Sequence, residues 1–167
     1  TETATVSTTA AAASAAAAVA GIAGISLSGA GAKATNTIST QTKASTSNST
    51  LNSADDVTLS ATDNSTIDAT IAAVSAAAAV GGTAGVGAAI GVSSAQNEIG
   101  GSIEATVSNV DLQAGGDLTQ TAKSNRSIDA EVLAGSVAIA GGAVGVGVGG
   151  AGSIVKNKTS TVVKATI

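Results

Sequence analysis

The sequence predicts an all-β fold, built either as a β-solenoid or as stacked β-hairpin repeats around a thin core of Ala, Gly and Val. Three observations predict it: a repeat of about sixty residues, alternating side chains in strand-like segments, and the absence of Phe, Tyr and Trp. Because aromatic rings normally dominate core energetics, a core without them must consist of thin layers in close backbone contact.

The repeat is visible in three sets of residues. The segment 56–71 aligns without gaps on 117–132. The other recurring features are the asparagines Asn36, Asn97 and Asn157 and the double glycines Gly81-Gly82 and Gly141-Gly142. We therefore expect one repeat over 1–65, a second over 66–126 and a truncated third over 127–167. An array that stops within a unit favours a longer parent chain over a complete mature protein.

Each unit has two parts of different composition. Long runs rich in Ala, Gly and Val are free or nearly free of charge, at 3–32, 70–97 and 132–155, and the segments between them carry almost every charged residue. In 102–122, apolar and polar residues alternate between Gly, Asn and Asp, which is typical of short strands joined by turns.

The small-residue runs are open to a second interpretation. The run 10–24 has the highest helix propensity available, so helical hairpins of small residues are the alternative fold. Against a helix, Val144, Val146 and Val148 alternate with glycines, which gives a strand one valine face and one bare backbone face. Strands are therefore favoured, and the bare face implies that another backbone layer lies unusually close.

Two repeated positions have expected structural roles. Gly81-Gly82 and Gly141-Gly142 stand where a hairpin turn with positive φ would lie. The three recurring asparagines are expected at one corner of the repeat, where each satisfies its own turn. The alternative is a stack of Asn side chains that hydrogen-bond along the array.

Composition argues against most chemistry. The chain has no His and no Cys, so the commonest general base and the soft metal ligands are missing, and we expect no enzyme and no cofactor. A net charge of −4 without aromatic rings argues against nucleic-acid binding. Asp55, Asp56 and Asp117 are weak candidates for calcium at stacked turns, but solubilising turn charges are the favoured interpretation.

The segments "SIDAEVLAGSVAIAGGAVGVGVGGAGSIVKN" and "EATVSNVDLQAGGDLTQTAKSN" resemble the repeats of giant secreted surface proteins of Gram-negative bacteria, the haemagglutinin-like and leukotoxin-like adhesins. The resemblance covers nearly the whole chain and is one of style. It implies a β-solenoid-like rod, secretion to the cell surface and a role in attachment or extracellular structure. It implies no catalytic residues.

The leading hypothesis is a non-enzymatic structural repeat of an extracellular rod, filament or adhesin that can associate with itself. Its partners would be neighbouring repeats, further copies of the chain or a host or cell-surface ligand. The alternative is a membrane-active or membrane-embedded hairpin protein, suggested by the charge-free runs, although Ala, Gly, Ser and Thr insert weakly and no stable span is expected. A minor alternative is an ice-binding solenoid with rows of Thr.

Overall fold

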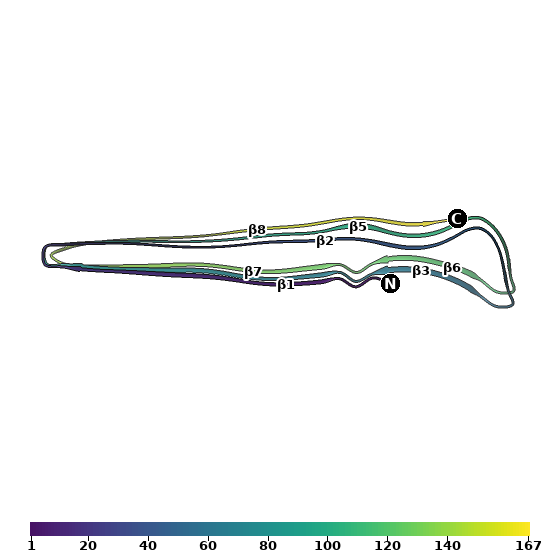
Figure 1. The fold of residues 1–167 in the computed structure, drawn as a ribbon, viewed down its shortest axis with the longest axis horizontal. Coiled ribbons are helices and arrows are strands. Elements are labelled where there is room, and N and C mark those ends of the chain that lie inside the picture. Colours follow the sequence, from purple (N-terminus) through teal and green to yellow (C-terminus); the bar gives the residue numbers. More distant parts are fainter.

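The chain runs back and forth along one long axis, and each pass consists of one or two β-strands (Figure 1). The computed structural model describes residues Thr1–Ile167. Its strands are β1 (Thr5–Ala20), β2 (Ala23–Ser53), β3 (Val57–Asp63), β4 (Thr66–Gly81), β5 (Ala84–Ala114), β6 (Leu118–Ser124), β7 (Ser127–Gly141) and β8 (Val144–Thr166). The all-β prediction is confirmed.

The strands form parallel sheets in which equivalent strands of successive repeats lie side by side. One sheet has the order β1-β4-β7, the second has the order β2-β5-β8, and the short strands β3 and β6 pair with each other. Partners lie 61 positions apart between the first two coils, as for Asn36 and Asn97, and 60 apart between β5 and β8, as for Asn97 and Asn157. The sequence repeat is therefore one turn of a flat β-solenoid-like coil.

Consecutive strands do not pair with each other, so the double glycines form no hairpin. β4 ends at Gly81 and β5 begins at Ala84, yet the two strands belong to opposite sheets. The chain therefore passes from one layer to the other at this point, and Gly142 takes a φ of 147° in the equivalent turn. Gly141 pairs with Val80 and not with Gly81, so the one-residue shortening of the third repeat falls in the turn.

The alanine-rich run of the first repeat is a strand, and the helical alternative is wrong. Residues Ala10–Ala13 pair in register with Ile71–Val74 of β4. A full ladder of backbone hydrogen bonds to β4 thus outweighs the helix propensity of alanine, which amounts to less than about 1 kcal/mol per residue. None of the chain forms a helix with the length and apolar character needed to cross a membrane.

The core lies between the two sheets and is best developed in the middle coil. Inward side chains of β4 and β5 are buried, whereas the equivalent side chains of β8 are exposed because no further strand covers them. Isoleucines fill the half of the interior nearer β3 and β6, including Ile67, Ile99 and Ile103, none of which is exposed. Toward the other end the inward residues are Ala, Ser and Gly.

The glycine face lies inside the molecule, as the alternation of Val and Gly predicts. Gly145 and Gly147 of β8 face the backbone of β7: a Cβ on Gly147 would lie 2.9 Å from the carbonyl oxygen of Ala138. Gly87 of β5 stands equally close to the carbonyl oxygen of Ile139. The two layers therefore converge toward the narrow end of the coil, where Figure 1 shows the ribbons drawing together.

Candidate functional site

The most polar buried cluster is centred on Asp63, the last residue of β3. Arg126 stands one repeat after Ser65, and its guanidinium reaches back across the coil: Nη2 donates to Asp63 Oδ2 at 2.7 Å and Nε to the same oxygen at 3.2 Å. Nη2 also donates to Thr40 Oγ1 at 2.9 Å, and Nη1 donates to Thr161 Oγ1 at 2.7 Å. Arg126 thereby links the β3 end of one sheet to β2 and β8 in the other.

Asp63 is stabilised in its charged form. Burial raises the pKa of this carboxyl, but hydrogen bonds from Ser65, Thr40 and Arg126, together with the positive charge of Arg126, lower the pKa below its ordinary value. Ser65 Oγ donates to Oδ1, and Thr40 Oγ1 donates to Oδ2. The carboxylate thus accepts hydrogen bonds at both oxygens. These contacts make the cluster a structural lock between Asp63, Thr40 and Arg126.

The recurring asparagines form a ladder inside the molecule, so their expected position at a turn is wrong. Asn36, Asn97 and Asn157 lie within β2, β5 and β8, facing the opposite sheet. Asn36 Nδ2 donates to Asn97 Oδ1 at 2.8 Å, and Asn97 Nδ2 donates to Asn157 Oδ1 at 2.9 Å. Parallel in-register stacking places identical amides one strand apart, so each amide satisfies the next along the axis.

Two further asparagine pairs lie on the surface and fix bends of the coil. Asn48 and Asn109 have φ values of 49° and 50°, a conformation that Asn tolerates, and Asn109 Nδ2 donates to Asn48 Oδ1 at 2.7 Å. Asn125 Nδ2 donates to Asn64 Oδ1 at 2.8 Å where β3 and β6 pass into β4 and β7. Both pairs repeat the geometry of the buried ladder.

The calcium candidates lie in the stacked turns that follow β2 and β5. Asp56 Oδ1 accepts a hydrogen bond at 2.8 Å from the backbone N–H of Asp117 in the next coil, and Ser53 Oγ accepts one at 3.3 Å from the N–H of Asp55. No group of three or more acidic side chains converges in a metal-binding arrangement. Asp56 therefore links its own turn to the equivalent turn of the next coil through this hydrogen bond.

Sequence reasoning missed the lock formed by Asp63, Thr40 and Arg126. Its one visible signal was that Arg126 is the only arginine of the chain, placed in a repeat position that Ser65 occupies one unit earlier. Arginine is the cation best suited to buried pairs because its planar fork binds several acceptors at once.

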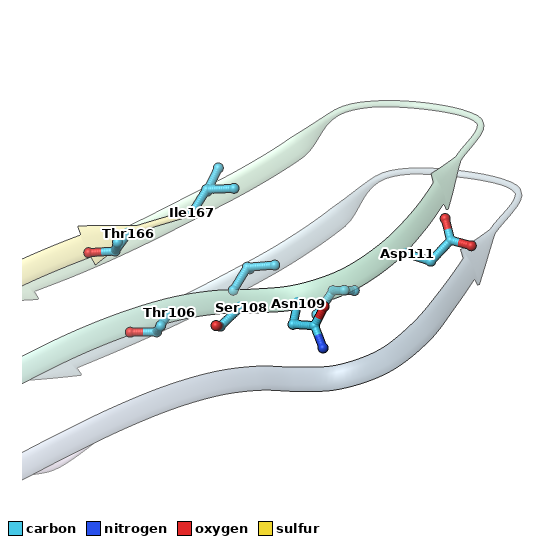
Figure 2. A pocket seen from close by; sticks show the side chains of 8 residues that line it. Thr106, Ser108, Asn109, Asp111, Thr166 and Ile167 are labelled. Atoms are coloured by element: carbon cyan, nitrogen blue, oxygen red, sulfur yellow. The ribbon is translucent and has the colours of Figure 1, made fainter.

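The largest hollow lies along the edge of β5, beyond the end of β8. It measures about 590 Å³ and is lined by Thr106–Asp111 together with Thr166 and Ile167. Figure 2 shows Thr166 and Ile167 at the end of one strand and Ser108, Asn109 and Asp111 following the neighbouring strand. Strand pairing stops at Thr106 and Thr166, so the hollow is an open strand edge.

The fold and its stacked polar ladders define a flat, parallel, β-solenoid-like repeat protein. No protein-family model matches the chain, and neither a curated protein nor a solved structure matches it.

Proposed function

We propose that this chain is a non-enzymatic structural repeat of an extracellular rod, filament or adhesin, in which coils add to one another through strand edges. The observation that carries the proposal is the in-register parallel pairing of every strand with its equivalent in the next coil. A repeat that pairs only with its own equivalents can be continued by any further copy of itself.

Burial supports the same mechanism. Ile99 and Asn97 of the middle coil are fully buried, whereas Thr159 and Asn157 at the same positions of β8 are exposed. Each coil gains its burial from the coils on either side. The outer coils therefore present long, flat strand edges, and such edges are templates for pairing with another chain.

The asparagine ladder also leaves hydrogen-bonding groups at the two end coils that a further copy could use. Asn157 Oδ1 accepts from Asn97, which leaves its Nδ2 group available at the outer edge of β8. Asn36 presents its Oδ1 in the first coil, where Thr8 Oγ1 donates to it at 2.6 Å. A second copy added in register along the axis would place Asn36 beside Asn157 and continue the ladder.

The proposed setting is the cell surface or the extracellular space. It rests on the resemblance to repeats of giant secreted bacterial proteins and on the small-residue layers, which need no disulfide or cofactor to hold together. The proposed partners are neighbouring coils, further copies of the chain and a host or cell-surface ligand.

Electron microscopy of the purified chain with an edge variant tests the proposal. Val155 points inward on β8 and is 47% exposed, so V155K should be tolerated by the coil and should block strand addition at this edge. The matched control is S160K, which adds the same charge on the outward side of β8. We expect end-to-end rods for wild type and S160K, and single particles for V155K. Rods of equal length from all three proteins would refute edge addition.

Membrane activity is the second candidate, and one observation favours it. Large apolar side chains point outward from both sheets near the narrow end, including Leu27, Val86, Val137 and Ile139. Flotation with liposomes tests it: a protein that stays in the aqueous fraction is not membrane-active.

A further inference from the structure

We propose that two copies of this chain also stack face to face, with the outer surface of the β1-β4-β7 sheet of one copy against the outer surface of the β2-β5-β8 sheet of the other. We call these surfaces the acidic face and the basic face, for the charges described below. The contact is lateral, so it goes beyond the proposed end-to-end rod and does not depend on it.

The apolar part of both faces is unusual because the side chains that point to solvent are larger than those that point into the core. Inward positions near the narrow end are Ala, Gly and Ser, whereas Ile25 and Leu27 on the basic face are 74% and 71% exposed. Leu133 and Ile139 on the acidic face are 60% and 61% exposed. Contiguous apolar surface of this kind marks an interaction site in a folded protein.

The two faces have complementary shapes at this end. The acidic face carries an apolar groove of about 310 Å³, floored by alanines of β1 and β4 and bounded by Val137 and Ile139 of β7. The basic face carries Ile25 and Leu27 as its most exposed large side chains within the sheet. A groove floored by methyl groups fits a ridge of larger aliphatic side chains.

The groove and the ridge lie at the same level along the coil. Ser14 Oγ and Ser28 Oγ are hydrogen-bonded across the two layers at 2.7 Å, which fixes the relative position of β1 and β2. Because these strands run in opposite directions, Ala15 lies level with Leu27 and Ala17 lies level with Ile25. A second copy displaced along the sheet normal therefore brings its ridge over this groove.

The charges of the two faces are opposite. Asp68, Asp129 and Glu131 are exposed on the acidic face, and Lys123 is exposed on the short strand β6, outside this sheet. The basic face carries Lys33, Lys43, Lys156, Lys158 and Lys164 against Glu98, Glu104 and Asp111. Of these residues only Lys158 and Glu98 form an ion pair, so both faces keep unpaired charges of opposite sign.

The opposite charges also come level with one another. Thr8 and Asn36 are hydrogen-bonded across the layers, and their equivalents in the third coil are Ala130 and Asn157. The neighbours of those two residues, Glu131 and Lys156, are therefore level, each on its own outer face. Asp68 and Asp129 stack as direct strand neighbours, an unfavourable like-charge pair that cations of a second copy would relieve.

A second copy fits these faces better than a lipid surface does. The three strands of the acidic face are 15 or 16 residues long and about 4.8 Å apart, so this face measures about 750 Å², close to the roughly 800 Å² per partner of a standard interface. Insertion into hydrocarbon would leave the open strand edges without hydrogen-bond partners, whereas lateral stacking leaves those edges in water.

Sedimentation equilibrium with a charge swap tests the proposal. In E131K, the acidic face of one molecule should repel the basic face of another molecule of the same variant. In K156E, the altered basic face of one molecule should repel the acidic face of another. Each variant should therefore associate about tenfold more weakly than wild type at low salt. Mixing the two variants makes each contact complementary again and should restore association. D55K, in a turn away from both faces, has the same change of charge as E131K and should behave as wild type.

The outcomes separate the lateral contact from the rod. The proposal is overturned if mixed E131K and K156E associate no better than either variant alone, or if wild type is monomeric at every concentration. It is also overturned if V155K weakens association while E131K and K156E leave it unchanged. That result would support the end-to-end rod without the lateral contact. Flotation of wild type with liposomes, with no association in their absence, would assign the apolar faces to lipid instead.

Discussion

Arg126 and Asp63 form an ion pair across two coils, with Nη2 and Oδ2 2.7 Å apart and side-chain exposures of 1% and 0%. The second ion pair, between Lys158 and Glu98, has the same N···O distance but side chains that are 57% and 37% exposed. The two pairs thus share an N···O distance and differ in burial. Burial decides what each contributes, because an unpaired charge is costly only where water cannot reach it.

The first prediction compares these two pairs. R126M removes the partner of a buried carboxylate and should lower the free energy of unfolding by about 3–5 kcal/mol. K158M removes an exposed partner and should cost less than about 1 kcal/mol. Urea denaturation followed by circular dichroism measures both, and equal losses would show that the buried network is not the lock described above.

The second prediction concerns the stability of the protein at acid pH. The pKa of Asp63 in the folded protein lies below its ordinary value of 3.8, so the folded chain binds this proton less readily than the unfolded chain does. The resulting stabilisation is fully present above the unfolded pKa and is lost as the pH falls through the lower, folded pKa. The free energy of unfolding of wild type should therefore fall more steeply below about pH 4 than that of D63N. Parallel slopes in urea titrations across this range would contradict the role of Asp63.

The third prediction concerns the buried asparagine ladder. N97A removes the middle amide and leaves Asn36 Nδ2 and Asn157 Oδ1 without partners, so it should cost about 1–3 kcal/mol. N125A removes one amide of the exposed pair with Asn64, where water replaces the lost hydrogen bond, and should cost clearly less. Chemical denaturation of the two variants against wild type provides the comparison.

The strand path could be predicted from the sequence because composition and period constrain it strongly. The alternation of Val144, Val146 and Val148 with glycine fixes one small face, and the repeat fixes which segments are equivalent. What could not be predicted was which strands pair. A turn at Gly81-Gly82 is compatible with a hairpin and with a crossing between layers, and only pairing between repeats distinguishes them.

The polar positions were predicted less well, for the same reason. A recurring Asn between polar residues is as typical of a turn as of a ladder. Asn36 lies inside the molecule because β2 continues to Ser53, so that Asn36 falls within the strand and not at its end. The lock around Asp63 depends on contacts between residues such as Thr40 and Arg126, 86 positions apart, that no local pattern displays.

The fourth prediction uses a buried hydroxyl that lacks a partner. Ser75 Oγ is buried in the alanine layer of β4 without a hydrogen bond, so S75A should raise the free energy of unfolding by about 1 kcal/mol. Ser93 is equally buried, but its Oγ donates to the carbonyl oxygen of Leu133 at 2.6 Å. S93A should therefore destabilise the chain. Thermal unfolding of both variants checks the opposite signs, and a loss of stability in S75A would mean that its hydroxyl is satisfied in solution.

The fifth prediction tests the close approach of the two layers near the narrow end of the coil by replacing two glycines of β8. Gly147 faces the backbone of β7, where a Cβ would lie 2.9 Å from the carbonyl oxygen of Ala138, so G147V forces the layers apart and should abolish folding or assembly. Gly150 lies on the outward side of β8, with no atom within 4 Å of a Cβ placed there. G150V should leave stability unchanged or raise it slightly, because valine suits a strand better than glycine. Soluble yield and circular dichroism separate the two outcomes. A folded, wild-type-like G147V protein would show that the two layers stand farther apart than the glycine face requires.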